Sequence, residues 1–489
     1  MYFKLKSNVI FRNYGTFGYI TDNRNFGYKK ENDIENDIGD KIVSLSGAVF
    51  LSALNRSPQT LDDLAEKINE KFANLDVETI KSDANDFYCL LELDGFIVSG
   101  KTAQECNVKD VGFLYMESTI TSGEDHFLNK EFGKSTQEFF DEYLKGKPQL
   151  TNLHIEITSM CNERCVHCYI PHENKVSSMN PDLFYDILEQ CRKMNLLHLT
   201  ISGGEPMTHE YFIDFLKKCN EYNFSVNVLS NLTLLDASIL GEMKKNQLLG
   251  VQVSLYSMDA NIHDKITQVK GSFEKTQKAI LKLIENNIPL QISCPIIKQN
   301  LHCYNDVLKW GKKHNINVGS DYVIIARYDH TTQNLNNRLS INDIKKIINE
   351  RVTNDEQYLD LMEKEFETKT NSSTDDFVCS VCHSSMCISE KGAVYPCAGW
   401  QDYVVGNIND TSLNDIWNNS KKVKYLRNLR RRDFPKCIQC HEKEFCTMCM
   451  VRNANEDSKG DPLKVNDYFC NIAKINKEIF FERKCILKK

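Results

Sequence analysis

LHIEITSMCNERCVHCY, residues 153–169, is the stretch that decides the fold. Its first six residues are rich in β-branched side chains, which favours a β-strand. Three cysteines follow directly, at positions 161, 165 and 168. About thirty residues later a second unusual segment, ISGGEP, occupies residues 201–206. Three thiols on one short loop need a physical reason, and the two segments have to be interpreted together.

The strand at residues 153–158 begins a regular alternation of strands and helices. Six strand–helix steps fit this region, with the last strand ending near residue 325. Such alternation predicts a parallel sheet with crossover helices, and six units predict a partial (β/α)6 barrel, so the fold class is α/β. In such barrels the functional groups collect on loops at the carboxyl ends of the strands. The cysteine loop would then follow the first strand, and SGGEP the second.

The cysteine loop indicates a metal site. Cys161, Cys165 and Cys168 can hold three irons of a 4Fe-4S cluster, because thiolates are the normal ligands of such clusters. The fourth iron would stay open and could bind a small molecule through an amine and a carboxylate. A zinc site or simple thiol packing is the alternative. Zinc normally takes four ligands, however, and His167 is held between two cysteines that would compete with it.

SGGEP supplies groups suited to an amino-acid-like ligand. Gly203 and Gly204 permit a close approach of the backbone, because no Cβ stands in the way. Glu205 can accept a charge-assisted hydrogen bond from an ammonium group. Pro206 stiffens the chain that follows.

These two motifs resemble those of the radical S-adenosylmethionine (SAM) superfamily, a CxxxCxxC loop followed by a GGEP-like segment. The resemblance covers roughly residues 149–330. It implies that S-adenosyl-L-methionine chelates the open iron, and that the reduced cluster cleaves it to a 5′-deoxyadenosyl radical that abstracts a substrate hydrogen. Residues at the ends of the third and fourth strands would contact the ribose or methionyl part of S-adenosyl-L-methionine. The cofactor-binding residues implied in this way are Tyr169, Gly203, Gly204, Glu205, Pro206, Asn231 and Ser254.

Residues 376–489 are rich in cysteine and have little continuous apolar periodicity, so this region is expected to need metal to fold. It resembles the SPASM extension of radical enzymes that modify peptides and proteins. Residues 392–397 match its GxxxxC element, and residues 437–446 match CxxCx5C. The next cysteine, Cys449, follows after two residues where the family has three.

The SPASM resemblance implies two auxiliary 4Fe-4S clusters. Cys379, Cys382 and Cys387 compete for at most two places at the inner cluster, and the first two are favoured. A zinc ribbon is the alternative, but the gap between Cys440 and Cys446 is much shorter than a ribbon's usual spacing. The implied ligands are Cys437, Cys440, Cys446 and Cys470 for the outer cluster, and Cys397, Cys449, Cys379 and Cys382 for the inner one.

Residues 1–100 predict a winged-helix-like α+β module. The expected elements are a hairpin turning at Gly15, a strand at residues 41–45, and three helical segments at residues 46–55, 60–72 and 77–97. The module carries 16 acidic against 11 basic residues, which disfavours DNA as its ligand.

Residues 41–68 of this module resemble the leader-peptide recognition domain of maturases of ribosomally made peptides, the type defined by the pyrroloquinoline-quinone peptide chaperone. In that family a leader peptide adds as an extra strand at a sheet edge, here residues 41–45, beside the third helix. A structural cap or dimer element is the alternative.

The remaining segments and the composition complete the domain assignment. Residues 101–148 are expected to form a linker with one helix at residues 136–146, and residues 331–375 a connector. The net charge of −7 argues against nucleic acid as a partner. The sequence contains neither a signal peptide nor an apolar run long enough for a membrane span, so we expect no membrane association and a cytoplasmic protein. Cysteines kept reduced there point to metal sites before disulfides.

Taken together, the sequence predicts a radical enzyme that docks a precursor peptide by its leader and modifies residues of the core peptide. Thioether crosslinking is the first choice, and carbon–carbon crosslinking or epimerisation are alternatives. The enzyme would draw electrons from a reductant such as flavodoxin or ferredoxin. Two other hypotheses stay open: a formylglycine maturase of the anaerobic sulfatase type, and a non-enzymatic iron–sulfur or zinc regulator. No general base or hydrogen donor can be named at this level.

Overall fold

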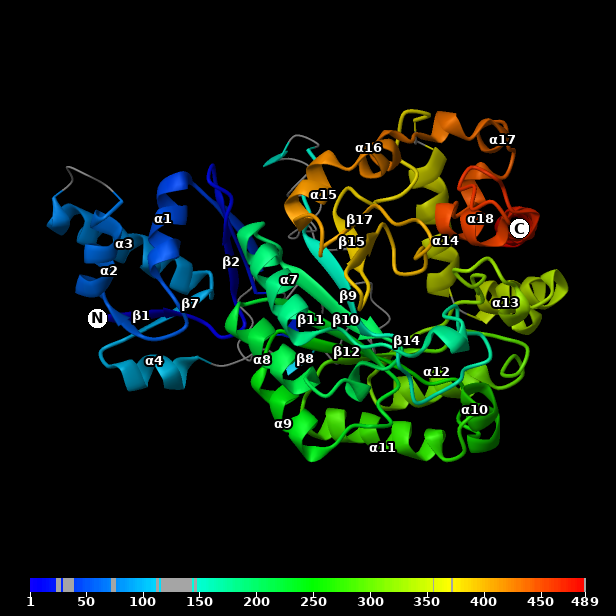
Figure 1. The fold of residues 1–489 in the computed structure, drawn as a ribbon, viewed down its shortest axis with the longest axis horizontal. Helices are drawn as coiled ribbons and strands as arrows, with labels where there is room; N and C mark the ends of the chain where they lie inside the picture. The colour runs from blue at the N-terminus through cyan, green and yellow to red at the C-terminus, as the bar shows by residue number, and fades with distance from the viewer. Residues whose placement is uncertain are drawn as a thin grey trace.

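The computed structural model describes residues 1–22, 28–29, 39–71, 76–110, 114–115, 143–144, 147–354, 356–370 and 373–487. The amino-terminal module lies at one end, the long sheet with its helices in the middle, and the cysteine-rich region beyond it (Figure 1). In the described part of the chain, no helix is both long and apolar enough to cross a bilayer.

The central sheet has nine strands in the order β14-β13-β12-β11-β10-β9-β15-β16-β17. The first six are parallel and follow chain order, which confirms the predicted partial barrel. Its last strand ends at Gly319, earlier than the expected residue 325. The parallel strands are β9 (Asn152–Thr158), β10 (His198–Gly203), β11 (Ser225–Ser230), β12 (Leu249–Ser254), β13 (Leu290–Ser293) and β14 (Asn317–Gly319).

The cysteine-rich region extends the same sheet, which the sequence did not predict. Strand β15 (Ser385–Ile388) pairs in parallel with β9 and aligns Cys387 with His154. Strands β16 (Ala393–Tyr395) and β17 (Gly406–Asn407) follow in antiparallel pairing. The barrel and the carboxyl-terminal region therefore share one hydrogen-bonded framework.

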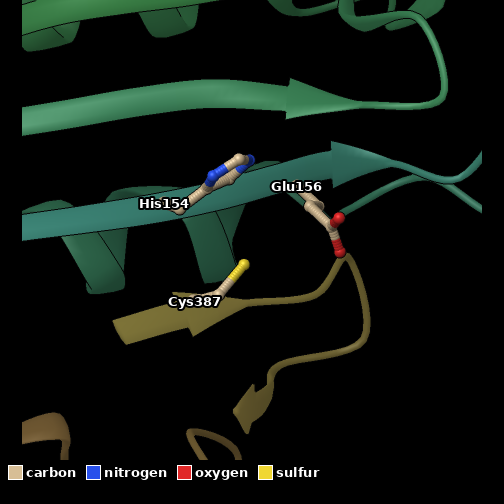
Figure 2. A group of neighbouring side chains, drawn as sticks. All are labelled: His154, Glu156 and Cys387. Carbon is tan, nitrogen blue, oxygen red and sulfur yellow. The ribbon is translucent and has the colours of Figure 1, made fainter. Parts of the chain in front are cut away.

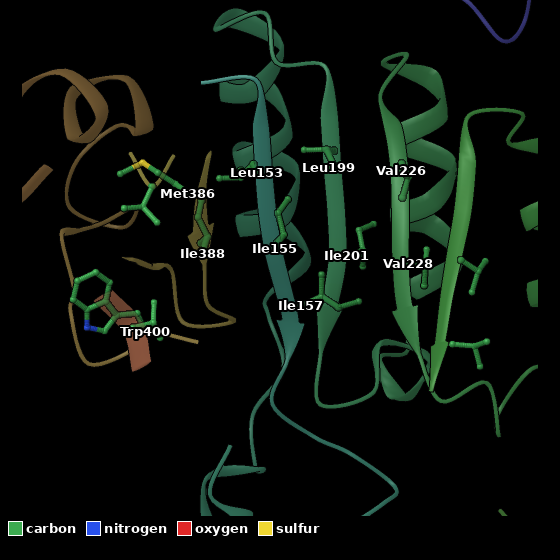
Figure 3. Close-up of a cluster of buried hydrophobic side chains, with 14 of the residues drawn as sticks. Leu153, Ile155, Ile157, Leu199, Ile201, Val226, Val228, Met386, Ile388 and Trp400 are labelled. Carbon is green, nitrogen blue, oxygen red and sulfur yellow. The ribbon is translucent and has the colours of Figure 1, made fainter. Parts of the chain in front are cut away.

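Alternation along β9 sorts its side chains between two faces. Leu153, Ile155 and Ile157 are buried in the main hydrophobic core, next to Leu199 and Ile201 of β10 (Figure 3). Because successive residues of a strand point to opposite faces, His154 and Glu156 point into the barrel. The helices of the repeating units are α7 (Pro181–Lys193), α8 (Phe212–Glu221), α9 (Ala237–Lys245), α10 (Ala260–Thr267), α11 (Ser272–Glu285) and α12 (Tyr304–Lys313).

Helices and an aromatic cluster hold the carboxyl-terminal region. Phe366 stacks on Phe445 at 5.0 Å between ring centroids, and both contact Phe480. The contacts tie the connector to the loop that carries the last cysteines. The helices are α13 (Ile341–Asn354), α14 (Glu356–Thr370), α15 (Leu413–Asn419), α16 (Lys421–Asn428), α17 (Pro435–Ile438), α18 (Met450–Glu456) and α19 (Asp467–Leu487).

The amino-terminal module has the predicted hairpin, third strand and three helices, and adds a sheet of three strands that the sequence did not reveal, β1, β6 and β7. Its sheets have the orders β6-β1-β7 and β2-β3-β5. The predicted helix at residues 77–97 ends at Leu93, since Gly95 adopts a positive φ and the chain then enters β7. The elements are β1 (Tyr2–Leu5), β2 (Ile10–Asn13), β3 (Gly18–Thr21), β5 (Asp40–Val43), α1 (Leu45–Ala53), β6 (Gln59–Thr60), α2 (Leu61–Asn69), α3 (Val77–Leu93), β7 (Ile97–Gly100) and α4 (Ala103–Lys109).

A short antiparallel pair joins β4 (Tyr28–Lys29) to β8 (Leu114–Tyr115). The helix predicted at residues 136–146 lies, apart from Tyr143 and Leu144, outside the described residues.

The module is attached to the barrel through the β2–β3 hairpin. Arg12 is buried and donates from Nε to the Leu196 carbonyl at 2.7 Å and from Nη2 to the Asn223 carbonyl at 2.8 Å. Burial lowers the pKa of this guanidinium to about 10, so it stays charged at neutral pH. Both acceptors immediately precede strands β10 and β11, so the module sits at the end of the barrel opposite the cysteine loop.

We expect Arg12→Ala to loosen this attachment. The substitution leaves two buried carbonyls without their donor, which should cost about 2 to 4 kcal/mol. Urea unfolding would measure the loss, and amide hydrogen exchange at residues 195–197 and 223–224 should rise. Arg12→Lys keeps the charge without the forked donors, so its free energy of unfolding should lie between those of the wild type and Arg12→Ala. Unchanged exchange in Arg12→Ala would contradict this account of the interface.

Candidate active site

The loop after β9 brings Cys161, Cys165 and Cys168 together, each partly buried. Burial raises the pKa of the Cys161 thiol to about 11 and that of Cys165 well above its usual value, and the neighbouring thiols add to the second shift. A bound iron would reverse these shifts, because a coordinating thiol is deprotonated outright.

The spacing of the thiols helps to distinguish a single zinc ion from an iron–sulfur cluster. Among the described residues, only His154, Glu156 and Cys387 form a group of three potential ligand atoms within 4.8 Å of one another. One tetrahedral zinc ion would hold its sulfurs about 3.8 Å apart, given Zn–S distances of about 2.3 Å. The wider cysteine sets therefore suit a multi-iron cluster better than a single zinc ion.

Neighbouring elements hold the cysteine loop from outside. The main-chain N–H groups of Arg164 and Val166 donate to Thr267 and Ile266 at the end of α10, both at 3.0 Å. The Tyr256 hydroxyl lies 3.8 Å from the Cys165 sulfur. The sequence analysis did not identify Tyr256. Its position just beyond the fourth strand, as an aromatic residue, was the one indication.

The two glycines of SGGEP fit the segment against this loop. The N–H of Gly204 donates to the Thr158 carbonyl at 2.8 Å, and that of Glu205 donates to Met160 at 2.8 Å. A Cβ added at Gly203, where φ is +136°, would lie 1.9 Å from the Thr158 carbonyl oxygen. The space left by the missing side chains is thus filled by residues 158–160, and a contact of the two glycines with a ligand stays a prediction.

Glu205 links three strands. Its Oε1 accepts from Ser230 Oγ at 2.8 Å and from the Met207 N–H at 3.0 Å, and its Oε2 accepts from the Asn231 N–H at 2.7 Å. Burial raises the pKa of this carboxyl to about 7. Its first role in the structure is to hold the end of β11, and a contact with an ammonium group stays a prediction. Pro206 begins a short 3-10 helix directly after it.

The remaining candidate cofactor residues lie around the same edge of the sheet. Asn231 donates from Nδ2 to Asn162 Oδ1 in the cysteine loop at 2.9 Å. Ser254 ends β12 and its side chain hydrogen-bonds to Tyr256. Tyr169 turns its hydroxyl into the barrel, 3.4 Å from Glu156 Oε1. The cofactor-binding roles of these residues stay predictions.

Lys175 adds a positive charge that the sequence did not reveal. The residue is 7% exposed, and its ammonium makes no hydrogen bond or ion pair with the described residues. Its charge lowers the pKa of Cys161 and Cys165 against the effect of burial. An ammonium in this position favours thiolates and suits a negatively charged group beside the cysteine loop.

The outer set of carboxyl-terminal cysteines lines one cavity. Cys437, Cys440, Cys446 and Cys470 surround a volume of about 300 Å³, and Cys449 reaches its wall. Burial raises the pKa of Cys446 to about 11, and the charges of Cys470 and Cys437 contribute. Four thiols around one void fit the outer cluster that we predicted.

The inner set is also brought together. Burial raises the pKa of the Cys379 and Cys397 thiols, and the nearby Cys449 adds to both shifts; Cys382 is buried beside Cys379 and Cys397. Cys387, the third competitor, instead lies on β15 with its sulfur near Glu156. Cys379 and Cys382 stay the predicted ligands of the inner cluster.

Comparison with known proteins agrees with this geometry. Residues 155–311 match the family model of the radical SAM superfamily, and residues 379–441 match the SPASM iron–sulfur cluster-binding domain. The chain carries a radical SAM domain followed by a SPASM domain. These domains imply 4Fe-4S clusters and S-adenosyl-L-methionine, and the cysteine sets described above fit the clusters.

Two curated relatives illustrate the range of the family. The chain is 24% identical over 348 residues to the tungsten-containing aldehyde ferredoxin oxidoreductase cofactor-modifying protein of Pyrococcus furiosus, covering 64% of this chain and 94% of that protein. It is 23% identical over 315 residues to the antilisterial bacteriocin subtilosin biosynthesis protein AlbA of Bacillus subtilis, covering 62% of this chain and 67% of that protein.

A solved structure resembles almost the whole chain. SuiB of Streptococcus suis, crystallised with the precursor peptide SuiA, superposes with a TM-score of 0.59 at 15% identity. The match covers 96% of this chain and 100% of SuiB. At this identity the likeness concerns the fold, and it extends beyond the two matched domains.

The close approach of SGGEP to the cysteine loop can be tested with two glycines. Gly203→Ala should lower the free energy of unfolding by about 3 kcal/mol or more, because the methyl group overlaps a carbonyl and the backbone is strained. Gly241→Ala is the matched control, since a Cβ there meets nothing within 4 Å. This helical site should gain about 0.5 to 1 kcal/mol. Equal effects in denaturant unfolding would refute the packing argument.

The outer cysteine set can be tested on one helix. Both Cys470 and Cys485 lie on α19, but only Cys470 faces the cavity. We expect Cys470→Ser to lose up to about four irons per chain in the anaerobically reconstituted protein, and Cys485→Ser to lose none. Cys387→Ser should also retain full iron. Iron analysis with absorption and EPR spectra decides the result, and loss of iron in Cys387→Ser would reassign that thiol as a ligand.

Proposed function

We propose that this chain is a cytoplasmic radical SAM enzyme that binds a ribosomally made precursor peptide by its leader and modifies the core peptide. Thioether crosslinking is the proposed reaction, with electrons from a flavodoxin- or ferredoxin-type reductant. The observation that carries the proposal is the combination of three cysteine sets with a module whose sheet edge is open. Two proteins reported above, SuiB and AlbA, are named for a precursor peptide or a bacteriocin, which supports a peptide substrate.

Strand β5 supports docking of a leader strand. It pairs with β3 on one side, and no other strand in the described part of the chain pairs with its outer edge. The hydrogen bond from the Asp22 N–H to the Gly39 carbonyl fixes the register of the ladder. Antiparallel alternation then directs the main-chain groups of Lys41 and Val43 toward β3 and those of Ile42 outward. An added strand would hydrogen-bond to Ile42.

Helix α3 offers apolar surface beside this edge. Lys41 forms an ion pair with Asp94 at the end of α3, which places the two elements side by side. Leu90, four residues before Asp94 on the same helical face, is 58% exposed. Leu45, just after β5, is 53% exposed. A leader strand with apolar residues at alternate positions could bury both leucines while its main chain extends the sheet.

The position of the module sets a length for the substrate. It attaches at the amino ends of β10 and β11, whereas the cysteine loop lies at the carboxyl ends. Strand β10 has six residues and spans about 20 Å. An extended peptide covers about 3.3 Å per residue, so at least about six residues must separate the leader strand from the modified residue. Separate leader and core segments of one precursor peptide meet this requirement.

The alternatives differ in what they require of the chain. Carbon–carbon crosslinking and epimerisation would use the same site and the same docking edge. A formylglycine maturase would not need the amino-terminal module. An iron–sulfur or zinc regulator would not cleave S-adenosyl-L-methionine.

The proposal is tested with the full chain, purified and reconstituted without oxygen. With dithionite and S-adenosyl-L-methionine it should release 5′-deoxyadenosine, and the triple variant with Cys161, Cys165 and Cys168 changed to Ala should release none. Each short peptide encoded beside the enzyme's gene is then co-expressed with it and analysed by mass spectrometry. Loss of two hydrogens together with one alkylatable thiol supports a thioether. Loss of two hydrogens with all thiols retained indicates a carbon–carbon bond, and an unchanged mass with altered stereochemistry indicates epimerisation.

The docking edge can be tested separately from the chemistry. Ile42→Pro removes the outward N–H of β5 and should weaken binding of the precursor peptide about tenfold, the equivalent of one hydrogen bond of about 1.4 kcal/mol. Ile42→Val keeps the N–H and should bind normally. Release of 5′-deoxyadenosine without peptide should be equal in both. Normal peptide affinity in Ile42→Pro, measured by fluorescence anisotropy with a labelled leader, would exclude strand addition at this edge.

A further inference from the structure

We propose that Glu156 is the proton acceptor for the reacting residue of the substrate, in a cavity between the radical SAM barrel and the SPASM domain. The proposal rests on the proposed function, because it requires a substrate that loses a proton during the reaction. Nothing in the motifs of either domain assigns this residue a role.

The cavity lies at the carboxyl end of β9 and β10. Its volume is about 290 Å³, near the lower limit of small-molecule sites. Gly203 of SGGEP forms part of its wall, so the cavity borders the expected cofactor position. The opposite wall comes from the SPASM side and includes Lys391. Tyr328 also lines the cavity. A side chain of a bound peptide would reach this cavity between the two domains.

The carboxyl group of Glu156 reaches the cavity from inside the barrel. The residue is 3% exposed. Gln401 donates to Oε2 at 2.6 Å, and the Tyr395 hydroxyl donates to the same oxygen. Oε1 has one long contact, 3.4 Å from the Tyr169 hydroxyl. One oxygen is therefore held in place while the other remains available to a substrate group.

Among the residues that the structure describes, no cation is paired with this carboxyl. The described residues place no lysine, arginine or histidine in an ion pair with Glu156. Burial therefore raises its pKa to about 8, and the nearby Glu390 charge adds to the shift. A general base is most effective when its pKa lies near the working pH, so this environment suits proton exchange under physiological conditions.

The neighbours of Glu156 do not compete for the proton near neutral pH. His154, Glu156 and Cys387 lie together across β9 and β15 (Figure 2). Burial lowers the pKa of His154 to about 4 and raises that of the Cys387 thiol well above its usual value. Glu156 is thus the member of this group that changes protonation near pH 8.

A metal ion is the alternative for the three clustered residues, but each of them already has a ligand atom engaged in a hydrogen bond. His154 Nε2 shares a hydrogen bond with Ser202 Oγ, and the Cys387 thiol interacts with Tyr395. Oε2 of Glu156 accepts from two donors. An ion would have to break these buried hydrogen bonds, which costs free energy for each group left unpaired. The network is better suited to holding one proton.

The step balances for the proposed thioether. A C–H bond and an S–H bond of the peptide break, and a C–S bond forms. The hydrogen atom leaves carbon to the 5′-deoxyadenosyl radical, giving 5′-deoxyadenosine. The thiol proton passes to the Glu156 carboxylate, and the remaining electron leaves to an auxiliary iron–sulfur cluster.

Glu156→Gln is the variant that tests the proposal. Its amide keeps the size and an acceptor oxygen but cannot take a proton. With the precursor peptide that the wild-type enzyme modifies, we expect crosslinked product to fall about 100-fold or more, the usual contribution of a general base. Release of 5′-deoxyadenosine and the iron content should stay within about threefold. Glu242→Gln is the control, because Glu242 is a buried carboxylate on α9, outside the site. It should leave both products unchanged.

The pH dependence gives a second readout. Product formation by the wild type should rise with pH and level off above about pH 8, as the raised pKa of Glu156 requires its carboxyl to ionise first. The residual activity of Glu156→Gln should lack this rise. Infrared difference spectra at pH 7 need no peptide, and should show a protonated-carboxyl band in the wild type that the variant lacks.

Each outcome decides a different point. Full crosslinking by Glu156→Gln, or the absence of the infrared band, would overturn the role of Glu156 alone. A joint loss of product, 5′-deoxyadenosine and iron would also overturn it, and would assign Glu156 a structural role. A wild-type enzyme that cleaves S-adenosyl-L-methionine but modifies no peptide would instead overturn the proposed function, and the proton acceptor with it.

Discussion

The main-chain contact between SGGEP and the end of β9 is the constraint on which the site depends. It fixes the cysteine loop to β10. Glu205 then joins β10 to the end of β11, because its carboxyl accepts from the Asn231 N–H at 2.7 Å. Asn231 then donates back to Asn162 within the cysteine loop. The three strand ends and the loop form a closed ring of hydrogen bonds. Such a ring holds the thiols in place before any cluster binds. Cluster binding then loses less conformational entropy than it would if the loop first had to become ordered.

The shared sheet brings residues of the two domains together. Because β15 pairs with β9, the SPASM domain is part of the same sheet as the barrel. Residues from both domains therefore meet around the inward-facing side chains of β9. Glu156 comes from the barrel, while Tyr395 and Gln401, which hold its carboxyl, come from the SPASM side. A carboxyl buried without a counter-ion is costly, and these donors reduce the cost without neutralising the group.

Local patterns allowed much of this to be predicted. Alternation of strands and helices gave the six parallel strands, and cysteine spacing gave three thiol sets that the structure brings together. What sequence could not give depends on contacts between distant segments. LHIEIT places His154 and Glu156 on one face of a strand, but only the pairing of β9 with β15 shows that Cys387 faces them. The glycines were recognised as points of close approach, but their main-chain neighbours before the cysteines could not be named, because a backbone neighbour leaves no local signal.

The position of Tyr395 would connect the proposed path of the proton with the proposed path of the electron. Tyr395 ends β16 and donates to Glu156, and Cys397 follows two residues later in the inner cysteine set. One short segment thus links the proposed proton acceptor to a proposed cluster ligand. In a low-dielectric interior, moving an electron away from the substrate while its proton stays behind would separate charge at high cost, since Coulomb energies there are several times those in water. If the proton goes to Glu156 and the electron to the adjacent cluster, the two charges leave in the same direction and stay close. Because β9, β15 and β16 are neighbours in one sheet, the two domains can provide both proposed acceptors from neighbouring strands.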